Sequence, residues 1–167
     1  AYGVTSANMA RDDMLAAVLI ASAIMVPIQF VFSSYSDRHG RKGIFMLGAI
    51  LTAIWAFVIF PLVDTGNFYL IVLAISGGLI FLAMMYGPQA AFFTELFSTE
   101  VRYSGATLGY QFGAIVGGAF APTIAVKLWT EFDIIWVSAY IALASLLTLI
   151  SVMALTETYQ SDLNNTD

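Results

Sequence analysis

The sequence contains no cysteine and only one histidine, His39. Without cysteine, the chain can form no disulfide framework and no thiolate metal site. One imidazole cannot build a zinc site by itself. The sequence also shows no glycine-rich nucleotide loop, no hydrolase triad and no cluster of metal ligands. We therefore expect no metal, no cofactor and no enzyme activity.

Charge is equally scarce. Only 10% of the 167 residues are charged and 60% are hydrophobic, whereas roughly 25% of an average soluble domain is charged. A soluble fold of this length must cover its surface with polar groups, so the composition indicates lipid as the surrounding solvent. The six Lys and Arg residues are scattered, and nucleic-acid binding needs a basic face. We therefore expect no nucleic-acid partner.

Five apolar runs are long enough to cross a membrane, which takes about 20 helical residues for roughly 30 Å of hydrocarbon. They lie at 14–35, 44–63, 68–88, 105–128 and 134–155, with no charged residue in any interior. Lipid offers no water to unpaired backbone groups, so the spans must be helices rather than strands. The sequence predicts an all-α membrane protein, with a helical bundle at 14–155 between a polar segment at 1–13 and a polar tail at 156–167.

The distribution of Lys and Arg predicts the orientation. The loop at 37–43 holds three of these cations and Arg102 lies on the same side, whereas the other side holds Arg11 and Lys127. Positive residues are enriched on the cytoplasmic side of membrane proteins. We expect a multi-pass protein of the cell (inner) membrane, with this loop and the carboxyl terminus cytoplasmic and the segment at 1–13 extracytoplasmic.

The number of spans is odd, whereas transporters built from three-helix repeats have an even number in each half. Five is one short of six. The first residue is Ala1 rather than methionine. We therefore expect a further span to precede Ala1.

The short loop at 36–43 reads SDRHGRKG. Gly40 permits a tight turn between two long helices, and Asp37 sits at a helix end. Arg38, Arg41 and Lys42 can anchor the loop at the anionic leaflet. Each residue alone can be read as a simple anchor. The whole pattern resembles the D-R-x-G-R-[RK] loop of the major facilitator superfamily, which recurs between the second and third and between the eighth and ninth spans.

A second segment reads YGPQAAFFTELF at 86–97 and VRYSGA at 101–106. It resembles the region between the tenth and eleventh spans in the metabolite:proton symporter branch, which includes transporters for shikimate, proline and betaine, α-ketoglutarate and citrate. The resemblance covers about 12–155. One departure is Ser98, where related families often have proline. The resemblance makes the five helices spans eight to twelve of a 12-span fold, the carboxyl-terminal half.

The resemblance implies proton-coupled symport of a small organic acid or zwitterionic metabolite by alternating access. Its partners would be the amino-terminal half of the same transporter, the lipid bilayer, the small-molecule substrate and the proton. The acidic coupling residues would lie in the other half, and the spans at 14–35, 68–88 and 105–128 would line the cavity. Two alternatives remain open: a uniporter or sugar porter of the same fold, and a non-transporting membrane scaffold or sensor.

Three charged residues are expected at the cytoplasmic ends of adjacent helices, namely Glu95, Arg41 and Arg102. A carboxylate between two guanidinium groups at a half-dry boundary forms strong charge-assisted hydrogen bonds. We hypothesise that the three form a latch that holds one state of the access cycle. The alternative is that they are separate, solvated anchors.

The fourth span carries glycine at every fourth position: Gly105, Gly109, Gly113 and Gly117, with Ala121 continuing the row. Such a strip lets another helix approach closely, and packing then replaces the missing hydrophobic drive. We expect helix packing within this half. The other interpretation is a smooth surface on which helices slide during transport.

Two amides lie inside the membrane spans, Gln29 and Gln111. At 100° per residue, Gln111 lies about 200° around the helix from Gly109 and can face a central cavity. Buried polar groups are costly in lipid, so each amide is a candidate for substrate binding; the alternative is an interhelical hydrogen bond. Tyr86 and Tyr110 are further cavity candidates, although tyrosines are also common near interfaces.

Caps and prolines predict local features of the helices. Asn67, Ser104 and Asp133 are placed to cap the third, fourth and fifth spans. Pro27 and Pro122 fall within helices, where proline removes a hydrogen bond and kinks the chain.

Overall fold

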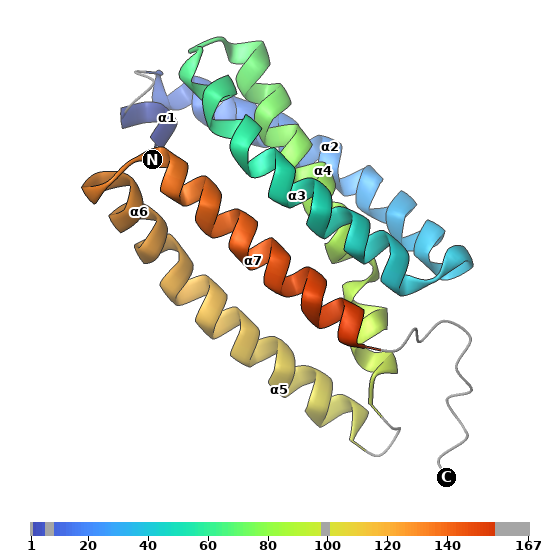
Figure 1. The fold of residues 1–167 in the computed structure, drawn as a ribbon. Helices are drawn as coiled ribbons and strands as arrows, with labels where there is room; N and C mark the ends of the chain where they lie inside the picture. Colours follow the sequence, from blue (N-terminus) through green and yellow to red (C-terminus); the bar gives the residue numbers. More distant parts are fainter. Residues whose placement is uncertain (1, 6–8, 98–100, 156–167) are drawn as a thin grey trace.

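The computed structural model describes residues 2–5, 9–97 and 101–155, and this part of the chain contains helices and no strand (Figure 1). Five helices are long and apolar enough to span a membrane, which confirms the predicted all-α membrane fold. The predicted tail at 156–167 lies outside the described residues. The elements are α1 (Tyr2–Thr5), α2 (Arg11–His39), α3 (Arg41–Asp64), α4 (Phe68–Glu95), α5 (Arg102–Ile115), the π-helical turn η1 (Val116–Phe120), α6 (Ala121–Glu131) and α7 (Ile134–Ala154).

The central helix is α4, which packs against both α2 and α3, and α3 packs in turn against α7. The elements α5, η1 and α6 form one continuous span that meets α4 near its beginning and α7 near its end. In Figure 1 the α2–α3 connection and the end of α4 lie at one end of the bundle, and α1 lies at the other. The motif loop and the end of α4 are therefore on the same side of the membrane.

Small residues allow the helices of the bundle to approach closely. A Cβ at Gly48 would lie 2.9 Å from Met84 Cβ, and one at Gly77 would meet the ring of Trp55. That indole donates its Nε1 proton to Ala74 O at 2.8 Å, joining α3 to α4. Since lipid provides no hydrophobic drive between helices, such packing holds the bundle together. The buried alanines are Ala17, Ala21, Ala49, Ala56, Ala74 and Ala83.

Four of the five spans extend beyond the predicted apolar runs, and α7 ends one residue before the end of its predicted run. At 1.5 Å per residue, the 29 residues of α2 span roughly 43 Å and exceed the hydrocarbon core. The largest difference is in α4, which continues through the buried Pro88 to Glu95 instead of ending at 88. An apolar run ends where polar residues begin, but a helix can continue into the headgroup region with polar side chains.

Of the three capping residues predicted from the sequence, one makes a capping hydrogen bond in the structure. Asn67 caps α4, because its Oδ1 accepts from the backbone N–H of Tyr69 at 2.9 Å. The prediction for Ser104 is wrong, since α5 already begins at Arg102. Asp133 occupies the N-cap position of α7 but makes no side-chain capping bond.

The turn η1 lies directly before Pro122, where the sequence predicts a kink. A proline ring collides with the carbonyl group four residues earlier in a regular α-helix, which here belongs to Gly118. The wider π-helical turn relieves this collision. Pro27 lies within the uninterrupted helix α2.

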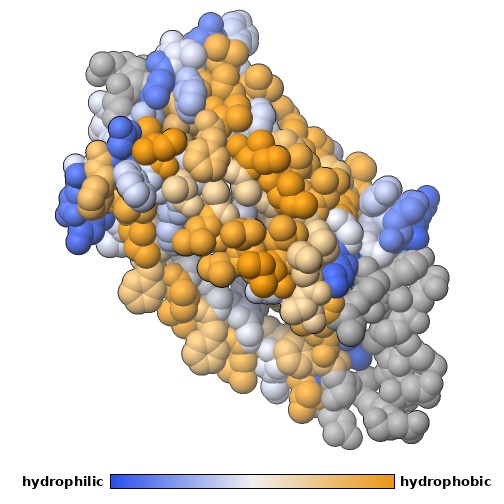
Figure 2. Space-filling view, in the orientation of Figure 1, coloured by the Kyte–Doolittle hydropathy of each residue, from blue (hydrophilic) through white to orange (hydrophobic). Residues whose placement is uncertain are grey.

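The span from α5 to α6 differs from the others, because none of its residues is buried. Its exposed apolar side chains are numerous, including Phe112 and Ile115. Figure 2 shows apolar side chains over most of the face in view and hydrophilic ones gathered toward the two ends. This distribution fits a bundle that lies across a bilayer.

The short helix α1 lies within the predicted extracytoplasmic segment and ties α3 to α6. The hydroxyl of Tyr2 donates to Asp64 Oδ1 at 2.6 Å, and its ring packs edge-on against Phe60 and Trp129. Burial, followed by the hydrogen bond and charge of Asp64, raises the pKa of Tyr2 to about 12. The phenol therefore stays protonated and keeps this bond at neutral pH.

Candidate functional site

The turn between α2 and α3 consists of Gly40 alone, with φ 106° and ψ 153°. This backbone region is accessible essentially only to glycine. The amide N–H of Gly40 donates to Ser36 O at 3.0 Å and closes the end of α2. One residue thus reverses the chain and brings the charged ends of both helices together.

We expect Gly40→Ala to destabilise the protein by about 1–3 kcal/mol, because alanine cannot adopt this conformation without strain. Gly43→Ala is the matched control. Nothing lies within 4 Å of a Cβ at Gly43, which is inside α3, and alanine there should stabilise the helix by about 0.5–1 kcal/mol. Thermal unfolding in detergent measures both. Equal shifts for the two variants would contradict the assignment of strain to Gly40.

An ion cluster joins this loop to the end of α4. The Nη2 of Arg41 lies 3.0 Å from Glu95 Oε1, and its Nε donates to both carboxylate oxygens at 3.3 and 3.4 Å. Through Nη1 the same guanidinium pairs with Asp37 and donates to Ser36 Oγ at 3.4 Å. The side chains of Arg41 and Glu95 are only 12% and 17% exposed. The cluster therefore holds the ends of α2, α3 and α4 together on the side of the motif loop, in a partly dry setting.

The third member of the predicted latch lies elsewhere. Arg102 donates from Nε to Phe97 O at 3.3 Å, and the ion pairs among the described residues include none between Arg102 and Glu95. Among the described residues Arg102 therefore lies apart from the Arg41–Glu95 pair, and the latch with all three members stays a prediction. Arg38, a further motif residue, is exposed in the last turn of α2.

Lys42 has a role that the sequence analysis missed. Its Nζ donates to Met153 O at 2.9 Å and to Leu155 O at 2.7 Å, at the end of α7. Unpaired carbonyl groups and the negative end of the helix dipole favour a cation there. The available signal was that Lys42 and the end of the last span are predicted on the same side of the membrane.

Two predicted cavity residues meet inside the membrane. The hydroxyl groups of Tyr86 in α4 and Tyr110 in α5 are 3.5 Å apart. With Gln89, Ala90 and Phe93 they line a cavity of about 260 Å³. Tyr86 lies nine residues before the end of α4 and Tyr110 eight after the start of α5, which corresponds to a depth of roughly 12–14 Å. The two hydroxyl groups therefore lie within the membrane spans, about a third of the way along each span from the side of the motif loop.

The two predicted glutamines do not line this cavity. Gln29 is half-buried where α2 crosses α4, and a Cβ at Gly87 would lie 3.0 Å from Gln29 O. Gln111 is exposed on α5. The amide that does line it is Gln89, which the sequence analysis missed. Its position three residues after Tyr86 on one helix face was the available signal.

The glycine strip meets almost nothing within the chain. A Cβ at Gly105 would lie 2.6 Å from the Phe97 ring, but no atom is within 4 Å of a Cβ at Gly109, Gly113 or Gly117. The expected packing within this half is therefore wrong at these three positions. The physical reason is that the span meets α4 only near its start and α7 only near its end, so its middle stands free.

Comparisons with known proteins agree with this architecture. The inner membrane metabolite transport protein YhjE of Escherichia coli (strain K12) is 35% identical over 150 residues, covering 90% of this chain and 34% of that protein. The shikimate transporter of the same strain is 31% identical over 143 residues, covering 85% and 33%. The glycine betaine/proline/ectoine/pipecolic acid transporter OusA of Dickeya dadantii (strain 3937) is 30% identical over 138 residues, covering 78% and 27%.

The chain spans about a third of the length of these curated relatives. No solved structure matches it. The family model of the Major Facilitator Superfamily matches residues 4–166, nearly the whole chain. With this match, five membrane-spanning helices and relatives named as transporters, the chain belongs to the Major Facilitator Superfamily.

Proposed function

We propose that the intact protein is a secondary active transporter that moves a small organic acid or zwitterionic metabolite together with a proton, and that this chain is its carboxyl-terminal half, spans eight to twelve. The observation that carries the proposal is the cavity between Tyr86 and Tyr110. It lies within the membrane spans, on a helix face that an amino-terminal half could meet, and transporters of this kind bind solutes between their two halves. The unburied span that contributes Tyr110 leaves room for an amino-terminal half.

The chemistry of the cavity supports a polar solute. Tyr86 and Tyr110 supply hydroxyl groups and Gln89 supplies an amide, and all three can donate hydrogen bonds to carboxylate oxygens. The aromatic faces can also accept a quaternary ammonium group. The relatives named as shikimate and as glycine betaine and proline transporters carry solutes with these groups.

The proton requires a group that this chain does not supply. The interiors of the five predicted spans contain no Asp, Glu, Lys, Arg or His, whereas proton-coupled transport normally uses a titratable side chain within the membrane. We therefore assign the coupling carboxylate to the amino-terminal half. Because positive residues are enriched on the cytoplasmic side of membrane proteins, we propose that the loop at 37–43 and the carboxyl terminus lie on the cytoplasmic side of the inner membrane.

The test is solute-driven proton uptake in membrane vesicles that carry the full-length protein. The panel is shikimate, betaine, proline, citrate, α-ketoglutarate and a hexose. Alkalinisation outside the vesicles on adding an organic acid or zwitterion is the expected result. Uptake of a labelled solute at a rate independent of the pH gradient would indicate a uniporter or sugar porter instead. No uptake of any solute by folded, correctly oriented protein would favour a scaffold.

The same assay tests the cavity. Tyr86→Phe and Tyr110→Phe each remove one hydroxyl group, and each should raise the KM for the solute by about 3–10-fold, since a net hydrogen bond contributes about 0.5–1.5 kcal/mol. Tyr69→Phe is the matched control, because Tyr69 is 81% exposed at the outer end of α4. An unchanged KM in both cavity variants would contradict this location of the site.

A further inference from the structure

A polar groove lies next to the transport cavity, on the side of the motif loop. It has a volume of about 350 Å³ and is lined by one residue near the end of α4 and four in the first turns of α5, namely Thr94, Arg102, Tyr103, Ala106 and Thr107. None of these five residues lines the transport cavity itself. The groove is therefore a second hollow between the same two helices.

The groove and the cavity follow the same faces of α4 and α5. On α4, Thr94 of the groove comes four residues after Ala90 of the cavity. On α5, Ala106 of the groove comes four residues before Tyr110 of the cavity. Residues four apart lie one above the other on a helix. The two hollows are therefore in line, and the groove leads from Tyr110 toward the membrane boundary at Arg102, about 12 Å away along α5.

Arg102 gives this groove a positive charge. Among the described residues its guanidinium group makes one hydrogen bond, from Nε to Phe97 O at 3.3 Å, while Glu95 is paired with Arg41. Arginine carries five N–H donors in a planar fork. Within the described part of the chain, the donors on both Nη atoms of Arg102 therefore remain available. Such a fork can bind a carboxylate through two parallel hydrogen bonds.

The hydroxyl group of Thr107 is a second donor in the groove. Three other threonines, Thr94, Thr130 and Thr148, each donate to a carbonyl group one turn earlier in their own helix, as threonine commonly does. No hydrogen bond joins the hydroxyl of Thr107 to a described residue. The groove thus combines a guanidinium group with an unengaged hydroxyl group, which suits a solute rich in oxygen atoms.

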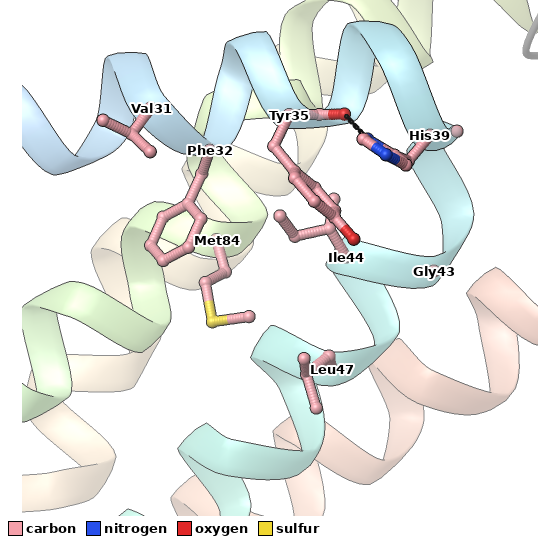
Figure 3. A pocket seen from close by; sticks show the side chains of 9 residues that line it. Val31, Phe32, Tyr35, His39, Gly43, Ile44, Leu47 and Met84 are labelled. Carbon is pink, nitrogen blue, oxygen red and sulfur yellow. Dashed lines mark hydrogen bonds between the residues drawn. The ribbon is translucent and has the colours of Figure 1, made fainter.

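Another hollow, between α2 and α3, lacks this chemistry. It has a volume of about 430 Å³ and is lined mainly by apolar side chains such as Phe32, Leu47 and Met84 (Figure 3). Its aromatic polar residues, Tyr35 and His39, stack on each other. Neither this hollow nor the transport cavity has Lys or Arg among its described lining residues. Of the three hollows, the groove is the one that offers a positive charge to a carboxylate.

We propose that the groove is a second solute site, in which Arg102 binds the carboxylate group of the solute as it passes between the transport cavity and the side of the motif loop. This inference rests on the proposed transport function and names the chemical group that is recognised. The carbonyl group of Phe97 holds Nε of Arg102, and both Nη atoms bind the carboxylate. Thr107, about 7.5 Å further along α5, donates to another polar group of the solute. The acidic and zwitterionic solutes proposed above all carry a carboxylate, whereas a hexose does not.

The test measures how a solute protects a cysteine in the groove from N-ethylmaleimide, a neutral thiol reagent, in the purified full-length protein in nanodiscs. The chain has no cysteine of its own, so Ala106→Cys introduces one reporter, and mass spectrometry of the α5 peptide measures its labelling. The probes are shikimate, betaine and citrate, and a hexose is the solute without a carboxylate. A transported carboxylate at ten times its dissociation constant should slow labelling by about tenfold, because the rate falls as 1 + [L]/Kd.

Variants of Arg102 test which group is recognised. Arg102→Gln should raise the solute concentration for half-protection by about 3–10-fold, as expected for a partly buried ion pair, and Arg102→Lys should raise it less. Tyr103→Cys is a second reporter, since this side chain is 85% exposed and tolerates substitution. Thr130→Cys is the matched control, because this exposed threonine lies beside Lys127 in a hollow at the other end of the span, where solutes should give no protection.

Three results would overturn the proposal. Equal protection by the hexose would show that the carboxylate is not the recognised group. Unchanged half-protection in Arg102→Gln would remove Arg102 from the site. Labelling that falls with the share of phosphatidylglycerol over phosphatidylcholine in the nanodisc, and with no transported solute, would assign the groove to a lipid headgroup.

Solute uptake by the same proteins separates this proposal from the transport function. Uptake of a carboxylate without protection of either reporter would overturn the groove site alone. Uptake of no solute would overturn the proposed function, and the groove site with it.

Discussion

Glu95→Gln is expected to lower the rate of solute uptake by the intact protein at least about tenfold. The variant removes the charge that two nitrogens of Arg41 contact at 3.0–3.4 Å in a partly dry setting. A hydrogen bond to a charged group contributes about 1.5–3 kcal/mol, and 1.4 kcal/mol is a factor of ten in an equilibrium. If the cluster stabilises one state of the access cycle, its loss shifts the population of that state by this factor.

The control is the same substitution at an exposed ion pair. Glu131 lies 3.9 Å from Lys127, and both side chains are more than half exposed. Such pairs contribute about 0–1 kcal/mol, so Glu131→Gln should leave uptake nearly unchanged. The measurement is the initial rate of labelled-solute uptake, normalised to folded protein in the membrane. If Glu95→Gln transported as well as Glu131→Gln, the ion cluster would be only an anchor.

Gly113→Leu should also reduce transport at least about tenfold, but for a different reason. Within this chain the position is open, since no atom lies within 4 Å of a Cβ there. The fold of this half should therefore tolerate leucine, which is also a better helix former than glycine. If the strip packs against the amino-terminal half, the added side chain holds the two halves apart, and overpacking of this kind costs about 1–3 kcal/mol.

Two further variants separate these effects. Ala114→Leu adds a side chain of similar size about 100° away from Gly113 on the same helix and should have a small effect on uptake. Gly77→Leu would collide with Trp55 inside the bundle and should lower the unfolding temperature as well as transport. Full uptake by the Gly113→Leu protein would show that the strip faces lipid or an open space.

The sequence predicted the fold well, because the membrane imposes a simple rule on apolar length. Five helices long and apolar enough to span a membrane are present, as predicted. The ends were less certain, since Pro88 suggested a boundary that α4 passes through to Glu95. A proline inside a membrane helix removes one backbone hydrogen bond, and packing against neighbouring helices can offset this cost.

The candidate site was predictable only where residues are close in the chain or carry a recurrent pattern. The motif at Asp37 and Arg41 led to the cluster with Glu95. Lys42 and the carbonyl groups at the end of α7 are more than a hundred residues apart in the sequence. Their contact depends on how α3 and α7 pack, which the sequence does not reveal. The position of Arg102 depends on the turn after α4, where a nearby carbonyl group competes with a more distant carboxylate.

The free-standing span from α5 to α6 has a consequence for biosynthesis. It is the least apolar of the five spans, so its partition from the translocon into lipid is the least favourable of the set. The described part of this chain covers little of it. If an amino-terminal half, synthesised earlier, packs on this span as proposed, the span gains most of its neighbours only from that half. Assembly of the two halves would thus act as a checkpoint, and a chain that fails to meet its partner presents this helix to membrane proteases.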